Sequence, residues 1–456
     1  MSDAPVLAFD DRTYTRSQVD ALSAGLADTL SQRGVHAGQR VALMSSNRPE
    51  FVFAVRAIWQ LGASAVLISP AWKAAEVSTA LAVSGAQHAV GDNPVLAELM
   101  PMLHLDEPIT PGSPSVAQPD PDADAVLVFS SGTTGLPKAV RHTHRSFAAG
   151  VRHWREALGM TAADRMQIAT PPSHILGLLN IATVLDAGGW MRLHRRFDID
   201  TMLQHIADDG ITIEMAVAPI ALAIASHPKL ETYDLSSLRY IMWCATPVTA
   251  SVADEVTRRT GIGWISAYGT SEVPVIACCP LDQPRLDTVG RPVPGVDVRI
   301  DSTGEIQVRS ESAMAGYLPD SETAAAFTDG WYRTGDIGYL DDDGWLRITD
   351  RLKEMVKVRG FQVAPAEIEA VLHGHPAVRD CAVFGVPDGI NGEAVVAAVA
   401  TEKPVAAEEL VGLVAERLAS YKRPRDIVFV PEIPRLPSGK ALRRVLKERY
   451  GRTSDQ

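Results

Sequence analysis

A segment rich in glycine and hydroxyl side chains, placed directly after an apolar run, constrains this chain more than any other feature. Residues 126–129 are apolar and predict a buried strand, and residues 130–138 then bring four hydroxyl groups, two glycines and Lys138. Glycine lets a backbone bend tightly and approach a ligand, and successive N–H groups in such a bend form a concave site for an anion. The hydroxyls and the ammonium add donors. The segment therefore predicts a phosphate-binding loop, distinct from the GxxxxGK[ST] type because lysine does not follow Gly135 directly.

The first half of the chain alternates between expected strands and expected helices. Residues 40–44 and 65–68 are predicted to be buried strands, and a helix is predicted after Thr15, which can form a capping box with Gln18. Strand–helix–strand units of this length favour a mainly parallel sheet with helices packed on it. Residues 101–124 are rich in Pro, Asp and Ser and lack periodicity, so we expect a surface linker there.

The character of the sequence changes twice in the second half. Short strands and turns, such as residues 296–300, predict a small antiparallel or barrel-like piece. A second change near residue 350 leaves about a hundred residues, enough for a small α+β domain. The expected fold class is therefore α/β: a large N-terminal domain of α/β layers with a small β-barrel-like piece, then a small α+β C-terminal domain. We place these domains at residues 1–351 and 352–456.

Composition and charge exclude several classes of function. The net charge of −12 argues against a nucleic-acid-binding surface. Four cysteines without CxxC spacing predict neither a zinc site nor a disulfide framework, and we interpret the adjacent Cys278 and Cys279 as small core residues. The N-terminus lacks a signal-peptide pattern, and no apolar run reaches the ~20 residues that a membrane-spanning helix needs. We therefore expect a cytoplasmic protein without a membrane span.

Three further motifs carry groups that suit a nucleotide. Residues 268–272 (Tyr-Gly-Thr-Ser-Glu) offer a ring that can stack on a purine, hydroxyls for a phosphate and a carboxylate for Mg²⁺. Asp336 can accept both hydrogen bonds of a vicinal diol, and the planar cation of Arg351 suits phosphate and ribose oxygens. Lys440 lies on a loop rich in Pro, Ser and Gly. By itself, each motif would be explained as well by an exposed turn, a surface ion pair or a solvated charge.

Together and in this order, the motifs resemble the signature of the adenylate-forming superfamily, which includes acyl-CoA synthetases, 4-coumarate–CoA ligases, firefly luciferase and the adenylation domains of peptide synthetases. The resemblance covers nearly the whole chain, and residues 350–369 are especially similar to 4-coumarate–CoA ligases and luciferases. Ser271 departs from the family's threonine but keeps the hydroxyl. The resemblance implies the superfamily's fold, in which the small C-terminal domain is mobile.

The resemblance also implies a role for each matching residue. Glu272 would hold Mg²⁺ and take part in catalysis, His174 would lie beside the substrate carboxylate, and Lys440 would bridge that carboxylate and the α-phosphate of ATP. Lys353 would be the hinge of the mobile domain, and Lys357 would serve the second half-reaction. The residues implied in binding ATP or CoA are Ser130, Ser131, Gly132, Thr133, Thr134, Gly135, Lys138, Ala245, Tyr268, Gly269, Thr270, Ser271, Asp336, Arg351 and Gly360.

These roles lead to an expected reaction. A carboxylic acid attacks the α-phosphorus of ATP·Mg²⁺, pyrophosphate leaves, and CoA then takes the acyl group from the acyl-adenylate. We expect an apolar acid, aromatic or aliphatic, because segments 216–219, 243–247 and 273–275, which align with the pocket wall, show no carboxylate or arginine. Cys244 stands where the family pattern usually has glycine, and the preceding Trp243 is large. Both depart from the familiar specificity pattern.

Three alternatives stay open at this point. The acceptor could be the phosphopantetheine of a carrier protein instead of CoA, and a luciferase-like oxygenase shares the C-terminal motifs. A non-catalytic nucleotide sensor is the alternative of a different class, and the joint presence of Lys440, Glu272 and Asp336 speaks against it. The expected partners are a small carboxylic acid, ATP and CoA, with no nucleic acid. A carrier protein and a homodimer are left open.

Overall fold

The computed structural model describes residues 4–114, 119–130, 138–244, 250–351, 354–358, 361–388, 393–418, 420–435 and 439–451. Of the predicted site residues, Ser131, Gly132, Thr133, Thr134, Gly135, Ala245, Lys353 and Gly360 lie outside these ranges. Ser130, Arg351 and Lys357 are described by their backbone alone.

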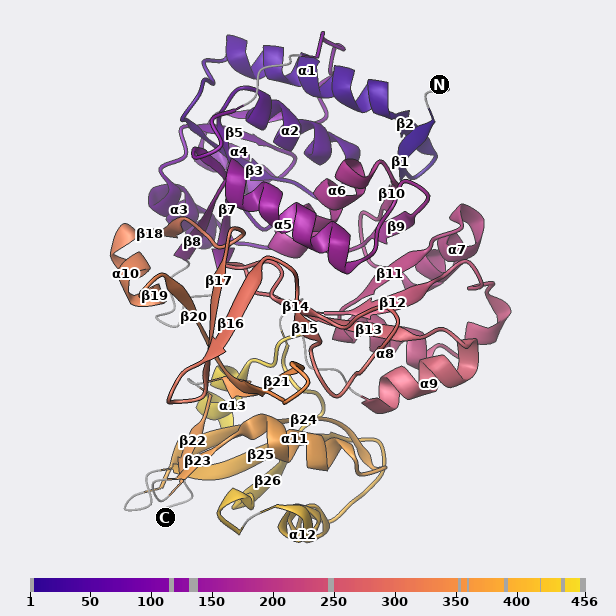
Figure 1. The fold of residues 1–456 in the computed structure, drawn as a ribbon, viewed down its shortest axis with the longest axis vertical. Helices are drawn as coiled ribbons and strands as arrows, with labels where there is room; N and C mark the ends of the chain where they lie inside the picture. The colour runs from indigo at the N-terminus through magenta and orange to yellow at the C-terminus, as the bar shows by residue number, and fades with distance from the viewer. Residues whose placement is uncertain are drawn as a thin grey trace.

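Two α/β layers make up most of the described chain, and the central strands of each sheet are parallel (Figure 1). In the first sheet, the pairs from β7 to β6 are parallel, whereas β8 and β18 are antiparallel. Its order is β18 (Gly316–Leu318), β8 (Lys138–Thr143), β7 (Asp124–Ser130), β4 (Ser64–Leu67), β3 (Arg40–Met44), β5 (His88–Gly91) and β6 (Met102–His104). The expected mainly parallel arrangement is confirmed.

The second sheet is parallel from β13 to β1 and antiparallel at both edges. Its order is β15 (Arg291–Pro292), β14 (Ala277–Cys278), β13 (Trp264–Tyr268), β12 (Tyr240–Trp243), β11 (Ile213–Ala216), β9 (Arg165–Ile168), β10 (Trp190–Leu193), β1 (Pro5–Phe9) and β2 (Arg12–Thr15).

Amphipathic helices cover these sheets and close three apolar clusters against them. The first helix begins at the predicted capping box, in which the Gln18 N–H donates to Thr15 Oγ1 over 3.2 Å and Gln18 Oε1 accepts from the Thr15 N–H. The helices are α1 (Arg16–Gln32), α2 (Pro49–Gln60), α3 (Ala74–Ser84), α4 (Pro94–Leu99), α5 (His144–Ala157), α6 (Ile175–Ala187), α7 (Ile199–Asp209), α8 (Ala218–Ser226) and α9 (Ala250–Thr260), with a 3₁₀ turn η1 (Leu230–Thr232). In the described part of the chain, no helix combines the length and the apolar character that crossing a membrane requires.

The expectation of a surface linker at residues 101–124 is wrong for its first part. Met102–His104 forms β6, a parallel edge strand beside β5, and the Gly112 N–H donates to the Ala21 carbonyl of α1 over 2.9 Å. A three-residue strand is too short to show periodicity in sequence, and its position is set by pairing with β5.

An antiparallel sheet follows the two layers and confirms the small β piece expected there. Its strands are β16 (Val296–Ile300), β17 (Glu305–Ser310), β19 (Phe327–Thr328), β20 (Trp331–Leu340) and β21 (Leu346–Arg351). The short helical elements η2 (Asp320–Glu322) and α10 (Thr323–Ala326) lie between β18 and β19.

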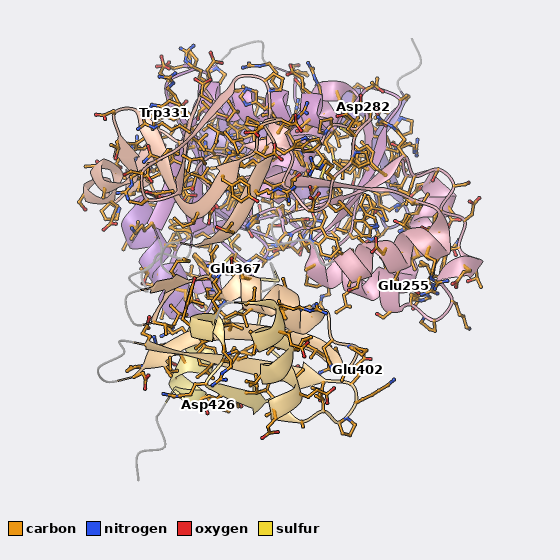
Figure 2. The ribbon with its side chains drawn as sticks, turned by 60° about the horizontal axis from the view of Figure 1, so that its bottom comes forward. Glu255, Asp282, Trp331, Glu367, Glu402 and Asp426 are labelled. Atoms are coloured by element: carbon orange, nitrogen blue, oxygen red, sulfur yellow. The ribbon has the colours of Figure 1, made fainter. Side chains whose placement is uncertain are left out.

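The C-terminal part has apolar clusters of its own, whose buried members all lie between residues 356 and 446. Figure 2 shows this part, where Glu367, Glu402 and Asp426 are labelled, below the rest of the chain. Its elements are β22 (Val356–Val358), β23 (Phe361–Val363), α11 (Pro365–His373), β24 (Val378–Pro387), β25 (Glu393–Thr401), α12 (Ala407–Arg417), η4 (Ser420–Lys422), β26 (Asp426–Phe429) and α13 (Arg443–Tyr450). The mixed α and β content matches the expectation for this region.

Candidate active site

Two predicted nucleotide-binding residues, 68 positions apart, meet at the end of β13. Tyr268 is the last residue of β13, and its hydroxyl donates to Oδ2 of Asp336 on β20 over 2.5 Å. Asp336 is only 2% exposed, and its backbone N–H donates to the hydroxyl of Thr334 over 3.0 Å. The ladder between β20 and β21 sets the backbone of Arg351 opposite Asp336. The fold thus gathers three positions that the sequence had assigned to one nucleotide.

The segment 268–272 is fixed by its own backbone geometry. The hydroxyl of Thr270 accepts from the N–H of Glu272 over 3.2 Å, in the manner of a threonine that stabilises a turn. A Cβ on Gly269 would lie 2.0 Å from the carbonyl oxygen of Pro274, so a larger residue cannot occupy this position without a backbone shift. The turn therefore presents Glu272 at a defined place beside Tyr268.

A hydrogen bond from His142 connects this segment to the first sheet. It lies on β8, is completely buried, and its Nε2 donates to the carbonyl oxygen of Ser271 over 2.8 Å. Burial lowers the pKa of His142, so the imidazole is neutral, and a carbonyl acceptor requires the proton on Nε2. The sequence analysis gave His142 no role, because its partner lies 129 positions away and no local pattern joins the two.

The Glu272 carboxylate is held by a tyrosine from the edge strand β18. Glu272 is 8% exposed, and its Oε1 accepts from the hydroxyl of Tyr317 over 2.8 Å. Burial and the neighbouring Glu272 charge raise the pKa of Tyr317, so this hydroxyl keeps its proton. Tyr317 is a site residue that the sequence analysis missed.

The Glu272 environment fits a magnesium ion that accompanies a nucleotide. The bond from Tyr317 engages Oε1 of the carboxylate, and its second oxygen, Oε2, is of the type that binds Mg²⁺. The described ranges hold no group of three or more metal-binding side chains. Mg²⁺ at a nucleotide site needs only one or two carboxylates, since phosphate and water oxygens complete its coordination.

Lys138 marks the described end of the predicted phosphate loop. Its backbone pairs with that of Ser130 in the antiparallel ladder of β7 and β8, so the intervening residues connect two neighbouring strands. The Lys138 ammonium forms an ion pair with Glu322 and lies 5.5 Å from the centroid of the Tyr317 ring. Tyr317 therefore contacts both Lys138 and Glu272.

His174 caps the helix α6, as the last residue before it. Its Nδ1 accepts from the N–H of Leu176 over 3.3 Å. The side chain of His174 is exposed, and desolvation by the residues around it lowers the pKa of the imidazole. The neutral ring then carries its proton on Nε2.

The side chain of Trp243, in a segment that aligns with the family's pocket wall, lies in the core. Trp243 is 1% exposed and packs its ring against that of Trp264, with 5.3 Å between centroids, in the apolar cluster under α8 and α9. The next residue, Cys244, is on the opposite side, in the main cluster, where burial raises its thiol pKa to about 12. The two neighbouring side chains therefore point to opposite sides, as successive residues of an extended chain do.

Lys440 is placed on the C-terminal part by an acidic partner. Its ammonium forms an ion pair with Glu354 over 3.7 Å, and Arg443 also pairs with Glu354. The same Arg443 reaches Glu369 on α11 over 2.7 Å. This network connects Lys440 to Glu354 and Arg443. Tyr268 and Glu272 belong to the end of β13 and the turn after it, and Asp336 belongs to β20.

Two family models match the chain, one over its N-terminal part and one over its C-terminal part. The model described as AMP-binding enzyme matches residues 1–318, and that described as AMP-binding enzyme C-terminal domain matches residues 367–440. The chain belongs to the AMP-binding enzyme family. The adenylate-forming superfamily indicated by the motifs is thereby confirmed.

Curated members of this family are similar over nearly the whole chain. A 4-coumarate–CoA ligase of Solanum tuberosum is 33% identical, covering 96% of this chain and 89% of the relative. A Rhodococcus jostii CoA ligase, named for a propanoyl group that bears a methyl-dioxo-octahydroindenyl ring, is also 33% identical and covers 97% of this chain and 95% of its own.

Solved structures of the family share the fold at similar coverage. The Bacillus subtilis O-succinylbenzoate CoA synthetase, in complex with ATP and a magnesium ion, has a TM-score of 0.88 at 30% identity and covers 98% of this chain and 97% of its own. An amide bond synthetase from Marinactinospora thermotolerans has a TM-score of 0.89, also at 30% identity and with the same coverage. The α/β fold with a small C-terminal domain is thus confirmed.

Proposed function

We propose that this protein, an acid–CoA ligase that uses ATP, Mg²⁺ and CoA, activates an apolar aromatic or aliphatic carboxylic acid as an acyl-adenylate and then transfers the acyl group to CoA. The observation that carries the proposal is the meeting of Tyr268 with Asp336 and of Glu272 with Tyr317 at the two ends of one five-residue segment, beside Lys138.

Each residue at this site would bind a different part of ATP, according to its charge and shape. Lys138 and the loop before it would neutralise the triphosphate, and Asp336 and Tyr268 would hold the adenosine. Glu272 would hold the magnesium ion, which neutralises phosphate charge when bound. The neutral imidazole of His174 would donate from Nε2 to the substrate carboxylate.

The C-terminal part would act in both half-reactions. We propose a division into domains 1–351 and 352–456, with Lys353 as the hinge. Lys440 would leave Glu354 and move to the forming bond between carboxylate and α-phosphate, where a fixed ammonium stabilises developing charge. After rotation, Lys357 and Gly360 would face the thiol of CoA.

The choice of an apolar acid is supported by the chain and by its relatives. The wall segments show no side chain that would bind a second charged group of the acid. The relatives named above act on a coumarate and on a ring-bearing propanoyl group. A carrier protein in place of CoA and a non-catalytic sensor remain outcomes of the test rather than proposals.

Exchange of pyrophosphate into ATP tests the first half-reaction. We expect exchange with a subset of a panel of aryl, short, medium and long-chain acids, and AMP release that depends on CoA for the same acids. Asp336→Asn is the matched negative control for nucleotide binding. Absence of exchange with every acid would favour a sensor, and AMP release that requires a carrier protein would replace CoA as the acceptor.

A further inference from the structure

Tyr317 occupies the junction between the two groups of opposite charge that would meet the triphosphate. It lies on β18, which pairs antiparallel with β8 so that Tyr317 faces Val140, two residues after Lys138. The Tyr317 N–H donates to Thr323 Oγ1 over 2.8 Å, which fixes the backbone of the edge strand. The ring is therefore placed by sheet pairing and by a local hydrogen bond together.

The Tyr317 side chain has a separate contact for each charged group. Its hydroxyl donates to Oε1 of Glu272 over 2.8 Å, and the ring lies 5.5 Å from the ammonium of Lys138. The Tyr332 hydroxyl on β20 also interacts with the Tyr317 hydroxyl. A phenol has one proton and a carboxylate can only accept, so that proton is directed at Glu272.

Tyr317 contacts two groups of opposite charge, Lys138 and Glu272, that could otherwise form a direct ion pair. Lys138 pairs with Glu322, and Glu272 bonds to Tyr317; within the described ranges, Lys138 and Glu272 do not pair with each other. A direct pair with Lys138 would offset the carboxylate charge that a cation needs. The tyrosine hydroxyl holds one oxygen of Glu272 without bringing a counter-charge, so the carboxylate keeps its charge for the ion, while Lys138 is paired with Glu322 instead.

We propose that Tyr317 is a positioning residue for the adenylation reaction: it orients the Glu272 carboxylate toward the magnesium ion and keeps Lys138 separate from that carboxylate. The inference rests on the proposed function, in which Glu272 binds Mg²⁺. Outer groups that hydrogen-bond to a metal ligand fix its orientation, and their loss typically weakens metal affinity about 10- to 100-fold.

Tyr317→Phe tests this because it keeps the ring beside Lys138 and removes only the hydroxyl. The measurement is Mn²⁺ binding, followed by electron paramagnetic resonance, to protein saturated with the α,β-methylene analogue of ATP, which cannot form an adenylate. We expect the Mn²⁺ dissociation constant to rise about 10- to 100-fold. Binding of the analogue without metal should stay unchanged, and pyrophosphate exchange should recover as Mg²⁺ is raised.

Two further tyrosines on β20 serve as comparison. Tyr339→Phe makes the same substitution at an exposed side chain, 48% accessible, and should bind Mn²⁺ as the unchanged protein does. Tyr332→Phe removes the hydroxyl that interacts with Tyr317 and should weaken Mn²⁺ binding by a smaller factor.

The outcomes separate the inference from the proposed function. If Glu272→Gln loses Mn²⁺ binding while Tyr317→Phe keeps it, Tyr317 is no positioning residue and the inference is wrong. If Glu272→Gln itself binds Mn²⁺ normally, the metal role in the proposed function fails. A Tyr317→Phe protein that loses metal-free nucleotide binding equally, with a lower unfolding temperature, would show a general structural role and would also overturn the inference.

Discussion

Glu214 is a buried acid that the proposed chemistry does not use. It lies on β11, is 1% exposed, and its Oε2 accepts from Nε2 of Gln167 over 2.6 Å. Gln167 Oε1 in turn accepts from Nε2 of His194 over 2.8 Å. Burial raises the pKa of Glu214 to about 8 and lowers that of His194 to about 4, so the cluster is mostly uncharged at neutral pH.

Glu214→Gln is expected to change how stability depends on pH. The folded pKa of about 8 lies above the ordinary 4.5, so the folded state binds the proton more tightly. The free energy of unfolding therefore falls as pH rises through this window, by up to about 1.4 kcal/mol per pH unit. The glutamine variant should lose this slope and be the more stable protein at the upper end, as measured by urea unfolding at several pH values.

Glu402→Gln is the control for that prediction, since Glu402 is exposed on the C-terminal part (Figure 2). Its pH profile should match the unchanged protein. A Glu214→Gln protein whose stability still fell with the same slope would show that Glu214 is ionised in the folded state.

At the scale of elements, the turn from β13 to β14 does the most to assemble the site. It carries Tyr268 and Glu272, it is tied to β8 by the bond from His142 to Ser271, and it lies against the backbone of Pro274. The two sheets are thus joined at the point where the nucleotide-binding groups meet.

Gly269→Ala should disrupt adenylation more than folding. The new Cβ would lie 2.0 Å from the Pro274 carbonyl oxygen, so the backbone must shift and carry Tyr268 and Glu272 with it. Misplacement of reacting groups by about 1 Å can cost 10²-fold in rate. We expect a loss of about that size in pyrophosphate exchange, with a small change in unfolding temperature.

Gly263→Ala, just before β13, is the matched control, because a Cβ there has no atom within 4 Å. It should leave exchange unchanged. Normal exchange in Gly269→Ala would mean that the turn can move without consequence for the site.

At the scale of the whole molecule, the two parts of the chain hold complementary groups. The part before residue 352 holds Lys138, Glu272 and, on the antiparallel sheet, Asp336. The C-terminal part, with its own apolar clusters, holds Lys440 in a network with Glu354 and Arg443. In the proposed reaction, the C-terminal part would bring Lys440 to the nucleotide.

Lys440→Ala should separate the two half-reactions. Loss of one preorganised charge at the reacting phosphate is expected to cost about 10²- to 10³-fold in pyrophosphate exchange. Thioester formation from synthetic acyl-adenylate and CoA should proceed nearly as before, since the proposed rotation would move Lys440 away from the acyl group. Lys447→Ala, on α13 of the same part, should affect neither reaction. Equal losses in both half-reactions would contradict the domain alternation.

The sequence predicted the site where function depends on short motifs. The capping box at Thr15, the strand before the phosphate loop and the segment 268–272 can be identified from neighbouring residues, because their physics is local. The family signature assigned Tyr268 and Asp336 to the same nucleotide, whereas the hydrogen bond between them is known from the structure alone. The sequence analysis did not predict the positions of Tyr317, Glu322 and the edge strand β6, because each depends on pairing between distant segments.

By itself, the sequence determined which chemical groups the protein has and the order of its strands and helices, since these follow from side-chain type and from apolar periodicity. The tertiary structure alone decided which of these groups touch. It placed the ring of Trp243 in the core against Trp264, on the opposite side of the chain from Cys244. It also set Tyr317 between Lys138 and Glu272, because the pairing of β18 with β8 brings together residues almost 180 positions apart.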